Sequence, residues 1–222
     1  TGNVSLSSTE EISLATLTTN GYNFELASET TDLTIENAFT LSGVETLSTR
    51  GADLIFESSA DISPGSTIDA GDGGMLEFQQ GGTASGTINV ENAIFKIGAD
   101  YAVDGDLITS SGTTWELGTS NLDLSGGALL LGGDVVLDNI LTNNQTKFKL
   151  AEDATVTRNT GFTLRGLNFE NYTLTLGSET TDLTLDTAAL TLPNVTIASN
   201  NSDYTQAKAG DIITLSITSS EA

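Results

Sequence analysis

Apolar and polar residues alternate in short runs along the whole chain, and Gly, Asn, Asp and Ser separate these runs. No long window places apolar residues at the i, i+3, i+4 and i+7 positions of an amphipathic helix. Alternation with a period of two, in segments rich in Thr, Leu, Ile, Val and Phe, is typical of β-strands separated by turns. The pattern therefore predicts an all-β protein made of many short strands.

Eight of these runs share one motif, in which any residue stands between two apolar residues. They are 24–26, 54–56, 76–78, 95–97, 115–117, 129–131, 148–150 and 174–176. Their starts are 14 to 30 positions apart, and several spacings are close to 20. Recurrence on this scale indicates a solenoid whose coils add strands to parallel sheets. We therefore expect a right-handed parallel β-helix (β-solenoid) with about 20 residues per coil.

The middle residue of each motif should point outward, while its two apolar neighbours point into the core. Trp115 occupies an inward position and is therefore predicted to be a core residue. If the motifs stack, one outward column reads Glu77, Lys96, Glu116, Leu130 and Lys149. Opposite charges on neighbouring strands stabilise a sheet, so this order favours stacking of successive motifs.

A sequence repeat indicates how the coils are organised. The heptapeptide SETTDLT occurs at 28–34 and again at 178–184, and the surrounding similarity relates about 3–47 to about 153–197. Seven identical residues argue against convergence on one turn chemistry and favour a duplicated stretch of coils. A chain cut from a longer array with a period near 150 residues fits the same observation.

We interpret residues 1–222 as a single elongated solenoid that contains this duplication. Its last segment, 200–222, combines a polar loop with the β-prone run DIITLSIT at 211–218. That run could cap the solenoid or be donated as a strand to a neighbouring subunit.

Charge and composition argue against several classes of function. The chain has 30 acidic and 7 basic residues and a net charge of −23, which argues against binding to nucleic acid or anionic membranes. Its apolar runs are too short to span a bilayer. The absence of Cys and His excludes thiol nucleophiles, His general bases and zinc sites of the usual kind. Absence of Cys also suits a secreted bacterial protein.

Calcium is the only candidate cofactor. Asp69 and Asp72 in DAGDGG, and Asp104 and Asp106 in DGD, place carboxylates beside glycine in expected turns. Ca²⁺ prefers oxygen ligands of this kind, but Asp and Gly are also favoured in turns for backbone reasons alone. Both interpretations remain open on the sequence.

We expect no enzymatic activity. Glycosidases use two carboxylates that face one groove, but among 30 acidic residues some close pairs are inevitable. A polysaccharide-degrading enzyme is therefore the least favoured function.

Strand–glycine–strand runs such as SGGALLLGGDVVLDNILTNNQTKFKLAEDATVT, at 125–157, resemble the β-solenoid passengers of bacterial autotransporters and filamentous-haemagglutinin-like adhesins. The resemblance is one of style, covers most of the chain and includes no specific motif. It implies an extracellular or cell-surface protein used for adhesion, matrix or filament building.

We therefore expect a secreted structural protein that assembles end to end with itself into a filament, a surface layer or an adhesive fibre. A terminal coil exposes strand edges that pair readily with another chain. The candidate assembly residues are Val4, Leu6, Ile212, Ile213, Leu215 and Ile217. The alternative is an adhesin or phage-fibre module that binds cell-surface glycans.

Overall fold

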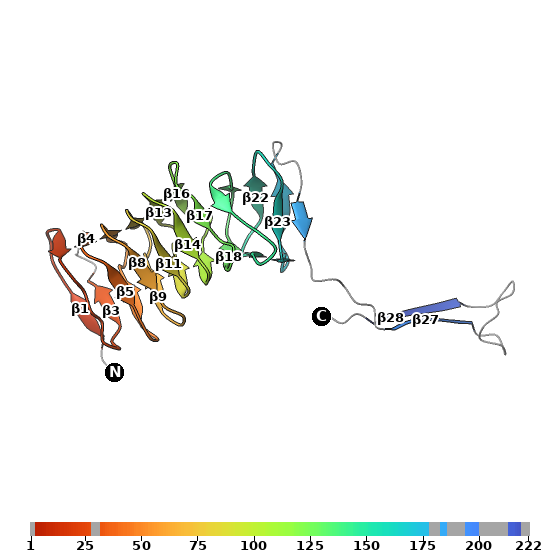
Figure 1. Ribbon diagram of the computed structural model, residues 1–222, viewed down its shortest axis with the longest axis horizontal. Helices are drawn as coiled ribbons and strands as arrows, with labels where there is room; N and C mark the ends of the chain where they lie inside the picture. The colour runs from red at the N-terminus through yellow and green to blue at the C-terminus, as the bar shows by residue number, and fades with distance from the viewer. Residues whose placement is uncertain (1–2, 28–31, 178–182, 186–193, 200–212, 219–222) are drawn as a thin grey trace. The chain divides into compact units, whose positions relative to one another are not determined.

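The computed structural model describes residues 3–27, 32–177, 183–185, 194–199 and 213–218. The chain divides into two units, Thr1–Asp186 and Thr187–Ala222. The first unit is a parallel β-solenoid whose coils follow one another from β1 onward (Figure 1). In the second unit the structure describes two antiparallel strands, β27 (Asn194–Ser199) and β28 (Ile213–Thr218).

From β3 onward, each coil contributes strands to three faces, whereas the first coil has strands only on the first and second faces. The first face is a nine-stranded sheet of β1 (Val4–Leu6), β3 (Phe24–Leu26), β6 (Thr46–Ser48), β9 (Thr67–Asp69), β12 (Thr87–Asn89), β15 (Asp106–Ile108), β18 (Ala128–Leu131), β21 (Lys147–Leu150) and β24 (Gly166–Asn168). The second face is a six-stranded sheet of β2 (Ile12–Leu14), β4 (Asp32–Ile35), β7 (Asp53–Phe56), β10 (Met75–Phe78), β13 (Ile94–Ile97) and β16 (Thr114–Glu116). The third face is a six-stranded sheet of β5 (Phe39–Leu41), β8 (Ala60–Ile62), β11 (Gly82–Ala84), β14 (Tyr101–Val103), β17 (Leu122–Asp123) and β20 (Ile140–Leu141).

The second and third faces are interrupted late in the solenoid. After β16, strands in second-face positions form a separate sheet of β19 (Val135–Val136), β22 (Ala154–Thr157) and β25 (Leu174–Leu176). After β20, the third-face positions hold the pair β23 (Phe162–Leu164) and β26 (Leu183–Leu185). Only the first face runs without a break through all nine of its strands.

Strand pairing confirms the predicted architecture. Along the first face all neighbours are parallel, and paired residues lie 19 to 23 positions apart in the sequence. The protein is therefore an all-β parallel solenoid with coils of about 20 residues. The right-handed winding stays a prediction.

The core is a column of inward apolar side chains, as the motif predicted. Leu54, Leu76 and Phe95 are fully buried on successive second-face strands. Phe56 and Phe78 stack with ring centroids 5.2 Å apart and nearly parallel planes. Burial of each such side chain contributes about 1.5–3 kcal/mol, so stacking of successive coils stabilises the solenoid along its length.

The predicted outward column is correct in one part and wrong in another. Glu77 lies opposite Lys96, and Lys96 lies opposite Glu116, on the second face. The Lys96 Nζ atom is 3.1 Å from Glu77 Oε1. Leu130 and Lys149, however, pair with each other on the first face. The motif changes face between 115–117 and 129–131, because 14 residues are too few for a whole coil.

Asp and Asn side chains bridge successive coils. In seven places an Oδ1 atom accepts a hydrogen bond, 2.7–3.0 Å long, from a backbone N–H 20 to 23 residues later. The acceptors are Asn23, Asp53, Asp61, Asp100, Asp134, Asp138 and Asp153. Hydrogen bonds to an ionised acceptor are stronger than neutral ones, so part of the chain's acidity has a structural role.

Candidate functional site

The two copies of the duplicated sequence fold with the same strand register. We call residues 3–47 the first repeat and residues 153–197 the second repeat. The matching pairs are Val4–Phe24 and Ile12–Leu33 in the first repeat, and Ala154–Leu174 and Phe162–Leu183 in the second. Every partner is shifted by 150 positions. The first four residues of the heptapeptide copy at 28–34, and the first five of the copy at 178–184, lie outside the described residues.

A turn is repeated at the same offset. The Tyr22 N–H donates to the Thr19 carbonyl at 3.0 Å, and the Tyr172 N–H donates to the Phe169 carbonyl at 2.7 Å. The residue after the acceptor has a positive φ in both turns, 50° at Asn20 and 51° at Glu170. Over these strands the second repeat is shifted by one face, because β3 lies on the first face and β25 takes a second-face position. Further along the repeats differ in structure, since residues 46–48 form the parallel strand β6, whereas residues 194–199 form the antiparallel strand β27.

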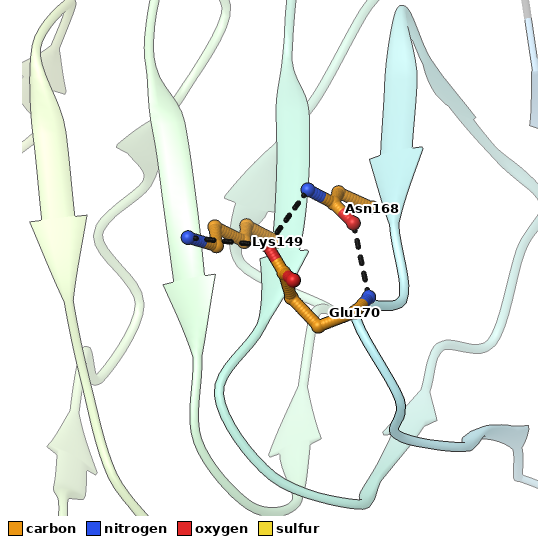
Figure 2. Close-up of polar contacts among 3 residues, drawn as sticks. All are labelled: Lys149, Asn168 and Glu170. Carbon is orange, nitrogen blue, oxygen red and sulfur yellow. Dashed lines mark hydrogen bonds and ion pairs between the residues drawn. The ribbon is translucent and has the colours of Figure 1, made fainter.

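Polar contacts fix the second of these turns on the preceding coil (Figure 2). Lys149 Nζ lies 3.4 Å from Glu170 Oε1, and Asn168 Nδ2 donates to the same oxygen at 3.1 Å. The Glu170 N–H in turn donates to Asn168 Oδ1 at 2.9 Å. Both partners of the ion pair are substantially exposed, so it orients the turn more than it stabilises the fold.

The start of the first repeat exposes apolar side chains that the second repeat buries. Val4 is 48% exposed, whereas its counterpart Ala154 is only 3% exposed. The difference arises because β22 is covered by β19, with Val135 opposite Val156, whereas β1 is the terminal strand of its sheet. The predicted assembly residue Val4 therefore lies at a strand edge, and Leu6, in the same strand, is half-buried.

The reverse holds at the other end of the described solenoid. Leu176 in β25 is 40% exposed, whereas its counterpart Leu26 in β3 is fully buried. β3 is followed by β6, with Phe24 opposite Leu47, whereas β25 is the terminal strand of its sheet among the described strands. A further coil placed before β1 would cover Val4, as the second repeat indicates, and one placed after β25 would cover Leu176, as the first repeat indicates.

The remaining predicted assembly residues lie in the second unit. Ile213, Leu215 and Ile217 belong to β28 and lie opposite residues of β27. Ile212 lies outside the described residues. The assignment of these four residues to assembly stays a prediction.

The two pairs of candidate calcium ligands lie in different surroundings. Asp69 accepts a hydrogen bond from the Gly71 N–H, and Asp72 accepts one from Asn92 Nδ2. Asp104 and Asp106 line a small pocket together with the cationic Lys147 and Arg165. In the part of the chain that the structure describes, no three acidic, His or Cys side chains come together as a metal site. Calcium binding at these four residues stays a prediction.

A cleft of about 570 Å³ opens where the second face is interrupted between β16 and β19. Trp115 and Leu117 line one side, and Val136, Asp134 and Asp138 contribute to the other. Trp115 packs against the core, as predicted, but it is only partly buried. The sequence analysis missed this cleft. The sequence feature that could have indicated the cleft is the glycine pair 132–133 before the very short apolar run 135–136.

Comparisons with known proteins identify no relative. No protein-family model, curated protein or solved structure matches the chain. The described residues contain no apolar helix of membrane-spanning length.

Proposed function

We propose that this protein is a structural subunit that assembles end to end, coil upon coil, into a filament, layer or adhesive fibre outside the cell. The observation that carries the proposal is the burial difference between the two repeats. Val4 is exposed at one end and Leu176 at the other, whereas their counterparts Ala154 and Leu26 are covered by a neighbouring coil.

The ends are complementary in kind. Strand β1 pairs in parallel with β3 in the same register in which β22 pairs with β25. The other edge of β22 pairs with β19, so the corresponding edge of β1 is the one that a strand of another subunit would occupy. At the other end, β25 is the counterpart of β3. Strand β3 pairs with β6 on its outer side, so the corresponding edge of β25 is the one that a second subunit would occupy. A contact between two such different edges is heterologous, so it repeats into an open filament unless its rotation closes a ring.

Burial and charge oppose each other in this assembly. Covering each exposed Val or Leu side chain contributes about 1.5–3 kcal/mol, and pairing of the strand edges adds backbone hydrogen bonds. Copies that each carry a charge of −23 repel one another, and salt screens that repulsion over about 8–10 Å at physiological ionic strength. Assembly should therefore strengthen as the salt concentration rises.

The location outside the cell rests on composition and resemblance. The chain lacks Cys, and its strand–glycine–strand style is similar to that of bacterial surface solenoids. High acidity keeps individual subunits soluble before assembly.

The test is sedimentation velocity with electron microscopy, at 0.15 M and 1 M NaCl with and without calcium. The unaltered chain should form assemblies that grow with protein and salt concentration. Val4→Asp and Leu176→Asp each place a charge in the stacked interface and should weaken association by about tenfold or more. Val44→Asp is the matched control, because Val44 is 90% exposed in a lateral turn.

Two results would contradict the proposal. One is an unaltered chain that stays monomeric at every protein, salt and calcium concentration. The other is assembly of the Val4→Asp and Leu176→Asp variants as strong as that of Val44→Asp. Circular dichroism of each variant separates loss of assembly from loss of folding.

A further inference from the structure

We propose that the cleft between β16 and β19 binds a neutral oligosaccharide. This site lies at the break in the second face and does not include β1 or β25, although its lining reaches Thr155 and Thr157 of β22, the strand next to β25. It would give an assembled protein a binding site on every subunit.

The cleft is a local interruption of an otherwise continuous face. β16 is the terminal strand of its sheet, and β19 pairs onward with β22. Residue Gly118, with a φ of 58°, takes the chain away from the second face directly after β16. Asn139 Nδ2 donates to the Gly118 carbonyl at 2.7 Å, so the coil that passes next is tied to this turn. The opening is therefore held by defined contacts on both sides.

One wall of the cleft is aromatic and fixed. Trp115 makes an edge-to-face contact with the buried Phe95, with centroids 5.9 Å apart and planes at 89°. This contact holds the indole from the core side while the residue lines the cleft. The C–H faces of sugar rings pack on aromatic and aliphatic surfaces of this kind, and Val136 extends the apolar surface on the opposite wall.

Carboxylates on the rim can accept hydrogen bonds from sugar hydroxyls. Asp134 Oδ1 accepts the Thr155 N–H at 2.7 Å, and Asp138 accepts both the Asn159 N–H at 3.0 Å and its Nδ2 at 2.6 Å. These inter-coil bonds fix both carboxylates in place. An ionised carboxylate offers about four acceptor positions, so each keeps capacity for a hydroxyl donor.

The charge of the lining decides which class of ligand fits. The residues that line the cleft, all in the described part of the chain, include two Asp and no Lys or Arg. Uronic acids, sulfated sugars and phosphates would therefore be repelled. A simple ammonium ion would fill little of a volume of about 570 Å³, which is in the range of cavities that hold ring-sized ligands. A neutral sugar uses the apolar wall and the carboxylate rim together.

The test uses the fluorescence of Trp115, which is the only tryptophan in the chain. The full chain is titrated with cellohexaose, maltohexaose and N-acetylchitohexaose, excited at a wavelength selective for tryptophan. We expect a saturable change with at least one of these neutral probes. Val136→Glu places a charge on the cleft wall and should weaken binding at least about tenfold. Val44→Glu, the same change at a remote exposed position, should bind like the unaltered chain.

Calorimetry with Trp115→Phe gives a readout that does not depend on the fluorophore. This variant keeps an aromatic contact to Phe95 and should bind more weakly because the indole surface is lost. Absence of saturable binding to all three neutral probes would overturn the proposal, as would equal binding by Val136→Glu. Binding confined to cationic glucosamine hexamer or tetramethylammonium, and abolished by salt, would also overturn it and would identify a cation site.

Discussion

Asp53 is a half-buried acid among other acids. It lies opposite Asp32 on the neighbouring strand, and its Oδ1 accepts the Met75 N–H at 2.9 Å. Burial raises the pKa of Asp53 above its ordinary value, and the negative charges of Asp32 and Glu77 raise it further, although the Met75 hydrogen bond lowers it. Folding therefore makes ionisation of Asp53 less favourable than it is in the unfolded chain.

The sign of the pH dependence follows from this direction. An acid whose pKa is raised on folding binds its proton more tightly in the folded state. Its unfavourable contribution to the free energy of unfolding is present in full above the raised pKa. That contribution disappears as the pH falls through the raised pKa to the ordinary value near 3.8.

Asp53→Asn should therefore stabilise the protein at pH 7, because the amide oxygen keeps the Met75 bond and carries no charge. The gain in free energy of unfolding, measured by urea denaturation, should shrink as the pH is lowered to 4. Asp61→Asn is the control, since Asp61 accepts a comparable bond from the Thr83 N–H on an exposed side chain. Equal destabilisation by both variants at pH 7 would contradict the argument.

At the scale of the element, one corner of the coil depends on a column of glycines. Gly86, Gly105 and Gly127 precede β12, β15 and β18, where the third face turns into the first. A Cβ atom on Gly105 would lie 1.9 Å from the Gly86 carbonyl oxygen, and one on Gly127 would lie 2.6 Å from that of Gly105. Successive corners approach too closely for any side chain.

Gly105→Ala should destabilise the solenoid by about 1–3 kcal/mol, the usual cost of forcing an extra carbon into a packed interior. Thermal and urea unfolding would measure the loss. Gly166→Ala is the matched control, because a Cβ there meets nothing within 4 Å and Gly166 lies within a strand. A loss no larger at Gly105 than at Gly166 would show that this corner is not close-packed.

Periodicity predicted the elements well because it reports side-chain direction. The motifs 54–56, 76–78 and 95–97 became β-strands of one face with both apolar residues inward. Spacing alone could not assign a face to each motif, since any face accepts an apolar–x–apolar strand. The error at 115–117 and 129–131 arose in this way.

The cleft could not be derived from the sequence for a related reason. Trp115 meets the requirement for an inward position, and it does contact Phe95. Its partial exposure depends on a pairing that does not form between β16 and the two-residue β19. Whether two strands pair is a property of neighbouring coils, and the periodicity of one strand carries no information about it.

At the scale of the whole molecule, the dominant feature is a charge of −23 on 222 residues. The ion pairs Arg50–Glu25, Lys96–Glu77 and Lys149–Glu170 each have at least one substantially exposed partner. Repulsion between the remaining acids opposes the folded state, and salt reduces that repulsion.

The melting temperature should therefore rise as NaCl increases from 10 mM to 300 mM, by about 2–4 °C if screening recovers about 1 kcal/mol. Differential scanning calorimetry at low protein concentration would measure this shift. KCl at equal ionic strength is the control and should give the same rise, because screening depends on ionic strength and not on the identity of the monovalent cation. A melting temperature independent of NaCl would show that the acids are already compensated within the fold.

The six Asp bridges between coils all have the same polarity: the earlier coil provides the acceptor and the later coil provides the N–H. Two Glu bridges run the other way, since the Gly21 N–H donates to Glu45 and the Ser111 N–H donates to Glu152. At each Asp bridge, a polypeptide that emerges with its N-terminus first therefore adds its N–H to a coil whose acceptor oxygen is already in position. At the two Glu bridges the donor comes first, and the acceptor arrives with a later coil. Most of these inter-coil bonds can therefore form as soon as the later coil is synthesised, which favours formation of the solenoid from its N-terminal coil onward.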